Sequence, residues 1–288
     1  MEEKVDLYKI RTLEERFSAT SNFVRENWNV LANNLLPIGL PLAVLVGLFM
    51  QYYMQDVFAM MADPMAMAAG AVNINWWAYA GLMISSMLFS LFIYATTGAI
   101  LCKYAEGSLT PDTKWADLEK YFFPIAGKVL IQLCILILII AVLSVIIGAL
   151  GAVLAFMNNP VVMASFIMLF TFAFIIVFIP VLSLMQYPIY LEQASAWQGI
   201  TKGFEWGFKY WGSTFLSCFL GSLILMVCVY ILSMPYAIYT VFNMGAGGWL
   251  GYVLLSLTFV ATLFLQPLLI VFMGFQYTSI ASRLSCDN

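Results

Sequence analysis

The residue types needed for most catalytic sites are missing from this sequence. The 288-residue chain contains no histidine, which removes the common zinc sites and the Ser-His-Asp triad. Its five cysteines lie far apart and form no C-x-x-C pair, and an odd number cannot form a complete set of disulfides. These cysteines are Cys102, Cys134, Cys218, Cys228 and Cys286. We expect them to act as small apolar packing residues.

A cluster of methionines is the one feature that could bind a soft metal. Met54, Met60, Met61, Met65 and Met67 lie close together in the sequence, and thioethers can bind Cu(I). The alternative is a Met- and Ala-rich helix in which the methionines pack against neighbours or lipid. Because no cysteine or histidine accompanies the cluster, we expect packing. The sequence therefore predicts no metal site, no cofactor and no enzyme activity.

The charged residues gather in three segments that precede apolar stretches. Most of their acids, such as Glu14, Asp117 and Glu205, are explained as helix caps or as parts of a hydrated helix face. The cations have a functional alternative, since Lys and Arg at an interface are attracted to lipid phosphates. The candidate headgroup contacts are Arg11, Arg16, Arg25, Lys202 and Lys209.

Three glutamines lie inside apolar stretches, where an amide must find a hydrogen-bonding partner. They are Gln132, Gln186 and Gln266. One interpretation is a polar seam that receives a neutral substrate or a lipid headgroup. The other is structural, with each amide joining two helices.

The elements that must position these residues are membrane helices. Apolar residues make up 63% of the chain and charged residues 9%, and the mean hydropathy is +0.94. Soluble domains carry roughly 25% charged residues, so the composition argues against a soluble enzyme or a secreted module. A net charge of −3 gives no basic field for nucleic acid.

Long stretches without charge predict six spans. No Asp, Glu, Lys, Arg or His lies between Asp63 and Lys103, between Lys128 and Glu192, or between Lys209 and Arg283. The last two stretches are long enough for two helices of about 20 residues each. Turn residues divide them, at Asn158-Asn159-Pro160 and at 243–248. The predicted spans are 35–53, 76–102, 129–157, 161–187, 215–242 and 249–278.

The positive charges predict the orientation. Of the twelve Lys and Arg residues, five precede the first span, four lie in 103–128, two in 188–214 and one on the C-terminal tail. By the positive-inside rule these segments, and both termini, are cytoplasmic. Segment 1–34 is too acidic for a cleaved signal peptide. We expect a protein of the bacterial cytoplasmic (inner) membrane.

An amphipathic segment precedes each odd-numbered span and indicates an internal repeat. The sequences Thr12-Leu13-Glu14-Glu15 and Ser195-Ala196-Trp197-Gln198 match a capping box, and Thr110-Pro111 matches a cap followed by proline. In the third segment the apolar stripe is Trp197, Ile200, Phe204, Phe208 and Trp211. The prediction is an all-α, single-domain bundle with three cytoplasmic interfacial helices and three helix-hairpin units, 12–102, 110–187 and 195–278.

This pattern resembles a loose group of uncharacterised six-span bacterial membrane proteins, which includes the membrane domain attached to some glycerophosphodiester phosphodiesterases. The matching features are the capped helix 12–33, the aromatic segment 203–211, and the prolines Pro180 and Pro267. The resemblance covers nearly the whole chain. The sequence departs from it in containing no soluble phosphodiesterase domain, so the resemblance implies an architecture and no activity.

Two functions follow as expectations. The first is a non-enzymatic membrane component with an accessory, structural or lipid-interacting role, whose partners are membrane lipids or another membrane protein and not nucleic acid. The alternative is an uncoupled permease, channel or lipid transporter for a neutral or lipid-like substrate. The alternative depends on a polar path beside the three glutamines, since no span carries a charged residue for a proton relay.

Overall fold

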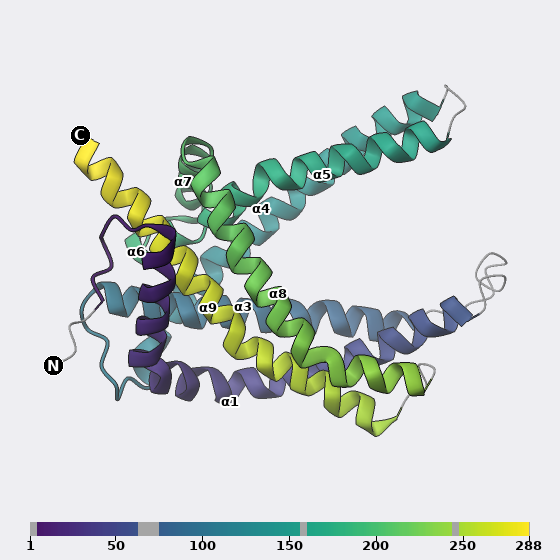
Figure 1. Ribbon diagram of the computed structural model, residues 1–288, viewed down its shortest axis with the longest axis horizontal. Coiled ribbons are helices and arrows are strands. Elements are labelled where there is room, and N and C mark those ends of the chain that lie inside the picture. Colours follow the sequence, from purple (N-terminus) through teal and green to yellow (C-terminus); the bar gives the residue numbers. More distant parts are fainter. Residues whose placement is uncertain (1–4, 63–74, 156–159, 244–247, 288) are drawn as a thin grey trace.

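A computed structural model describes residues 5–62, 75–155, 160–243 and 248–287 of the chain. All regular elements in these residues are helices, which confirms the all-α prediction (Figure 1). The helices are α1 (Leu13–Ala62), α3 (Trp76–Ala105), α4 (Trp115–Ala155), α5 (Pro160–Leu184), α6 (Tyr187–Glu192), α7 (Ala196–Lys209), α8 (Trp211–Phe242) and α9 (Trp249–Asp287).

Within the described residues, six helical stretches are long and apolar enough to cross a membrane. They are α1, α3, α4, α5 continued into α6, α8 and α9. Each predicted span falls on one of them, and the ends of the span 129–157 lie partly outside the described residues. The six predicted spans are confirmed as apolar helices, and the protein is a polytopic membrane protein.

The first amphipathic segment is joined to its span in one helix. Thr12 caps α1 as predicted: its backbone N–H donates to Glu15 Oε2 at 2.7 Å, and its hydroxyl accepts from the Glu15 N–H at 3.3 Å. The helix bends at Asn27, which has a non-helical φ of −110° and ψ of 16°. The Asn27 amide donates back to the Phe23 carbonyl at 2.8 Å. We call residues 13–28 the amphipathic segment of α1.

The predicted cap of the middle segment is wrong, because α4 begins at Trp115 and not after Thr110. The Thr113 N–H donates to the Thr110 carbonyl at 3.0 Å, which closes a turn. Asp117 then accepts from the Lys114 N–H at 3.0 Å and caps the helix. From Trp115 the helix continues through Pro124 into the apolar stretch, so this segment is also joined to its span.

The third amphipathic segment forms a separate helix, α7. Its capping box is confirmed: the Gln198 N–H donates to Ser195 Oγ at 3.2 Å, and Gln198 Oε1 accepts from the Ser195 N–H at 2.9 Å. The helix ends at Tyr210, which has a φ of −114° and ψ of 33°, and α8 begins at Trp211. A separate interfacial helix is therefore found in only one of the three units described.

The three hairpins are arranged differently. Figure 1 shows α4 and α5 as an arm that diverges from a group formed by α1, α3, α8 and α9. Within that group α8 packs on α9, α9 on α1, and α1 on α3. The arm joins the group at its base, where α4 contacts α3 and α5 contacts α7 and α8.

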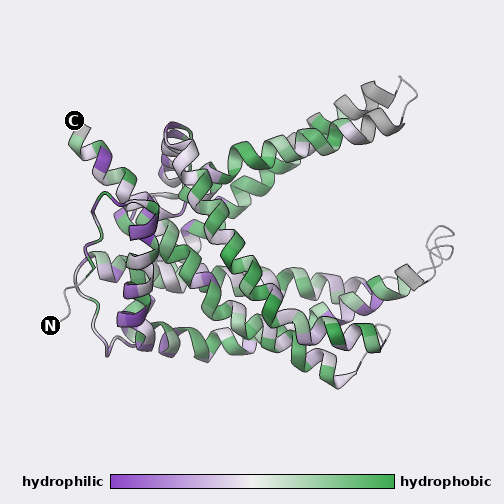
Figure 2. Ribbon diagram, viewed as in Figure 1, coloured by the Kyte–Doolittle hydropathy of each residue, from purple (hydrophilic) through white to green (hydrophobic). Residues whose placement is uncertain are grey.

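Many of the fully buried side chains lie around α3, against which α1, α6 and α9 pack. Phe23, Ile100 and Tyr190 are fully buried there, and Phe275 and Tyr277 almost fully. Hydrophilic residues gather on the amphipathic segment of α1 and on α7, whereas the long helices are apolar along their length (Figure 2). One side of the amphipathic segment is therefore polar, and its other side packs against neighbouring helices.

Candidate functional site

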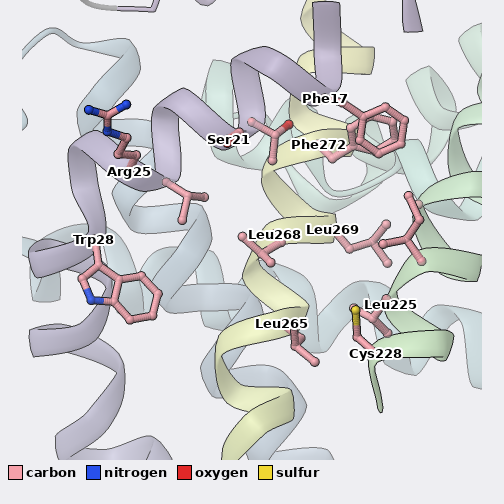
Figure 3. Close-up of a pocket in the computed structure, with 14 residues that line it drawn as sticks. Phe17, Ser21, Arg25, Trp28, Leu225, Cys228, Leu265, Leu268, Leu269 and Phe272 are labelled. Atoms are coloured by element: carbon pink, nitrogen blue, oxygen red, sulfur yellow. The ribbon is translucent and has the colours of Figure 1, made fainter. Parts of the chain in front are cut away.

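A groove of about 660 Å³ lies between the amphipathic segment of α1 and the helices α8 and α9 (Figure 3). Its size falls within the range of small-molecule sites. The residues that line it are Phe17, Thr20, Ser21, Val24, Arg25 and Trp28 of α1, Gly221, Ile224, Leu225 and Cys228 of α8, and Leu265, Leu268, Leu269 and Phe272 of α9. Arg25 is the one charged residue among them.

The floor of the groove is apolar and follows two helices. On both α8 and α9 the lining residues recur at three- and four-residue intervals, which places them on one face of each helix. Each row covers two helical turns, about 10 Å. Gly221 lets the two helices come close, because a Cβ built there would lie 2.8 Å from Leu269 Cδ1.

Aromatic pairs bound the groove on two sides. Phe17 stacks on Phe272 with ring centroids 4.4 Å apart, and Trp28 lies against Phe264 with centroids 5.4 Å apart. Both pairs join α1 to α9. Trp28 and Ile224 remain 46% and 51% exposed, so the groove is open to the surroundings of the helices.

Two polar lining residues, Ser21 and Arg25, lie at the rim of the groove, whereas Thr20 is buried and donates to the Arg16 carbonyl at 2.8 Å. Ser21 and Arg25 are four residues apart and therefore share one face of α1, and both are exposed. Figure 3 shows the Arg25 guanidinium pointing away from the leucines of the floor. Its stem lines the groove while its charged end reaches outward, as expected of a long cationic side chain.

Arg16, one of the predicted headgroup contacts, lies instead in a buried cluster of neutral groups. It is only 5% exposed. Its guanidinium donates to Ser217 Oγ at 2.5 Å, to Gln276 Oε1 and to the Arg11 carbonyl. The Gln276 amide in turn donates to Thr214 at 3.1 Å. Arg16 therefore joins α1 to α8 and α9.

Arg11, a second predicted headgroup contact, is also buried. Its guanidinium donates to the backbone carbonyls of Asp6, Leu7 and Lys9 and lies 4.9 Å from the centroid of the Phe275 ring. Burial lowers the pKa of Arg11 below its usual value, and Asp6 and Glu15 oppose that shift. For Arg11 and Arg16 the structure differs from the predicted surface contacts, because their donors are used within the protein.

The remaining predicted headgroup contacts are more accessible. Lys202 pairs with Glu192 and lies 5.4 Å from the Trp206 ring centroid. Lys209 is exposed and lies 5.8 Å from the Tyr210 ring centroid. Headgroup contact stays a prediction for these lysines and for Arg25.

The three glutamines of the predicted polar seam lie in different parts of the structure. The buried Gln132 donates to the Met185 and Ala196 carbonyls at 3.0 and 3.2 Å. Gln186 accepts from the Tyr190 hydroxyl at 2.7 Å within the short α6 region, and Gln266 lies on α9. The structure brings Gln132 close to the turn that holds Gln186, whereas Gln266 lies on another helix.

Sequence reasoning missed the groove and the role of Gln276. The groove forms because the amphipathic segment of α1 packs against helices about 200 positions later in the chain. A local sequence pattern does not reveal such a contact. A signal for Gln276 was present, because a buried arginine needs acceptors and this amide lies near the C-terminal end of the last predicted span, 249–278.

The methionine cluster is described only in part. Met54 and Met60 are half-buried near the end of α1, and Met65 and Met67 lie outside the described residues. Among the residues that the structure describes, no group of three His, Cys, Asp or Glu side chains could hold a metal ion.

Comparison with known proteins gives no match to a family model, a curated protein or a solved structure. The resemblance to six-span membrane proteins therefore stays a prediction.

Proposed function

We propose that this protein is a non-enzymatic integral membrane protein that binds a membrane lipid, with an acyl chain held in the groove between α1, α8 and α9. The observation that carries the proposal is a groove of about 660 Å³ whose floor is apolar and whose one lining charge lies at the rim. A phospholipid has a matching arrangement, with an apolar acyl chain that fits the floor and a polar headgroup that fits the rim.

The energetics of binding an acyl chain within a membrane differ from those of binding an apolar ligand from water. A lipid tail that enters the groove moves out of a bilayer interior that is already as apolar as leucine. Its entry therefore gives little hydrophobic free energy, and van der Waals packing must supply the affinity. The groove offers such packing through Phe17, Phe272 and Trp28, which bound it, and through two helix faces about 10 Å long. We therefore infer modest affinity for the chain and recognition at the rim.

The alternative function, an uncoupled permease, channel or lipid transporter, has less support. It requires the three glutamines to line one polar path. In the described chain Gln132 and Gln186 bond near the base of the α4–α5 arm, whereas Gln266 lies on α9, outside the arm. These contacts favour the structural interpretation of the glutamines.

We also propose that the protein lies in a cytoplasmic membrane of bacterial type with both termini inside. The distribution of the twelve cations supports this orientation. A membrane-impermeant thiol reagent, applied to a variant that retains only the exposed Cys286, should label it only after the membrane is made permeable. Labelling in intact cells would contradict the orientation.

Native mass spectrometry of the full-length protein, released from its membrane in mild detergent, tests the lipid-binding proposal. We expect a bound phospholipid on the wild-type protein. Cys228→Trp should remove it, since Cys228 lines the groove and a larger side chain fills it. Val227→Trp is the matched control, because Val227 is the preceding residue, is 47% exposed and does not line the groove.

The two variants make the result decisive. Loss of the lipid in Cys228→Trp with retention in Val227→Trp supports the groove as the binding site. A wild-type protein without lipid, or equal lipid content in both variants, would contradict the proposal. A co-purifying protein in place of a lipid would favour an accessory role in a complex.

A further inference from the structure

We infer that the groove selects an anionic phospholipid over a zwitterionic one, with Arg25 and Ser21 at the rim contacting the phosphate-bearing headgroup. This inference rests on the proposed function and adds to it the class of lipid. It depends on the chemistry of the rim, whereas the proposed function depends on the apolar floor.

The first step is the charge of the lining. Arg25 is positive, and the other lining residues carry no charge. The three acids of the same segment, Glu14, Glu15 and Glu26, do not line the groove. A net negative headgroup at this rim is therefore complementary in charge.

The second step is the geometry of the donors. Ser21 and Arg25 are one helical turn apart, and both are exposed. A hydroxyl and a guanidinium on one face can donate to two oxygens of the same phosphate. A guanidinium has five N–H donors, so Arg25 can bond to a phosphate while it keeps an interaction within the chain.

The third step is the position of the rim relative to the floor. In Figure 3 Arg25 and Ser21 lie at one side of the groove, and Leu265, Leu225 and Cys228 lie at the other. A phospholipid with its phosphate at Arg25 can therefore extend its acyl chain over the leucines. Arg25 also precedes the first predicted span, in a segment that we propose to be cytoplasmic. This orientation places the headgroup in the inner leaflet.

Fluorescence quenching by brominated lipids tests this inference, because Trp28 lines the groove. The full-length protein is reconstituted in mixed vesicles of phosphatidylglycerol and phosphatidylcholine, in which only one lipid carries brominated acyl chains. The Trp28 signal is the difference between each protein and its Trp28→Phe counterpart. We expect phosphatidylglycerol to be preferred about fivefold near Trp28, as one interfacial cation allows.

Substitutions distinguish the effect of Arg25 on lipid preference from the effect of the other cations on the predicted cytoplasmic side. Arg25→Gln should reduce the preference to about one, whereas Arg25→Lys should retain most of it, because the charge remains. Lys209→Gln is the control: Lys209 is an exposed cation on the same predicted side of the membrane and does not line the groove. We expect this control to leave the preference unchanged.

Each outcome bears on one of the two proposals. Equal quenching of wild-type Trp28 by the two lipids would overturn the headgroup inference and leave lipid binding intact. A preference that persists in Arg25→Gln, or that falls equally in Lys209→Gln, would also overturn it. Absence of Trp28 quenching by either lipid would overturn the proposed function itself.

Discussion

Arg16 shows how this protein accommodates a cation away from water. Burial of a guanidinium is costly unless its donors are satisfied, and the partners described for Arg16 are a carbonyl, a hydroxyl and an amide. Charged hydrogen bonds to neutral groups contribute about 1.5–3 kcal/mol. The same contacts hold Phe17 and Thr20 of the groove wall in place, because these residues follow Arg16 on α1.

We predict that Arg16→Lys destabilises the protein by about 1–3 kcal/mol. Lysine keeps the charge but lacks the planar fork that reaches Ser217, Gln276 and the Arg11 carbonyl together, and donors or acceptors are then left unsatisfied. Thermal denaturation of the purified protein in detergent measures the effect as a lower midpoint.

Arg25→Lys is the matched control for that experiment, since Arg25 is exposed on the same segment. Its midpoint should stay close to that of the wild type. Equal midpoints for Arg16→Lys and the wild type would show that the buried cluster does not stabilise the fold.

The sequence predicted which cations precede a span but not which ones are buried. Position 12 and position 195 could be identified as caps because a capping box is a local pattern. The burial of Arg16 could not, because its acceptors Ser217 and Gln276 lie 201 and 260 positions later in the sequence. The side of α1 that packs is decided by helices α8 and α9, far away in the sequence.

At the scale of the element, α7 packs through its glycines as well as through part of its predicted apolar stripe: Ile200 is buried, and Phe204 lies 6.1 Å from Phe178 of α5 between ring centroids. Gly199, Gly203 and Gly207 are buried against the end of α5, while Trp197 is 63% and Phe208 45% exposed. Water does not drive aromatic residues together within a membrane, and small residues let helix backbones approach. A hydrophobic stripe is therefore a weaker guide to packing here than in a soluble protein.

We predict that Gly207→Ala weakens the packing of α7 on α5. A Cβ at position 207 would lie 2.7 Å from the Cα of Val181, a backbone atom that cannot turn aside. Overpacking of this kind costs about 1–3 kcal/mol. The measurement is the midpoint of thermal denaturation, together with the rate of proteolysis in the connection that precedes α7.

Gly212→Ala provides the comparison, because a Cβ at Gly212 meets no atom within 4 Å. In a helix this change should be neutral or stabilising by up to about 1 kcal/mol. If Gly207→Ala behaved like Gly212→Ala, α7 would be able to move away from α5 at little cost.

At the scale of the molecule, three hairpins that look alike in sequence occupy different surroundings. The first and third pack together through α1, α8 and α9, and the middle hairpin forms the arm. Periodicity and charge predicted six spans, since each span is a local property. They could not predict the arm, because its direction depends on a few contacts at its base.

The direction of the arm depends on contacts around Gln132. Its amide joins α4 to the end of α5 and to the start of α7, and Lys128 adds a hydrogen bond to the Gln193 carbonyl at 2.8 Å. From Gln132 to the end of α4 the helix extends roughly 35 Å. A small rotation at the base is therefore amplified at the far end of the arm.

We predict that Gln132→Leu broadens the distribution of distances between the arm and the other helices. Spin labels at the exposed positions Leu169 of α5 and Val241 of α8, in a cysteine-free background, report that distribution by pulsed electron resonance. Gln186→Leu is the matched control, because Gln186 accepts from Tyr190 within the α6 region and does not join α4 to α7. An unchanged distribution in Gln132→Leu would mean that apolar packing alone directs the arm. Broadening in Gln132→Leu but not in Gln186→Leu would instead assign that role to one buried amide, which is the structural function that an amide in hydrocarbon is expected to serve.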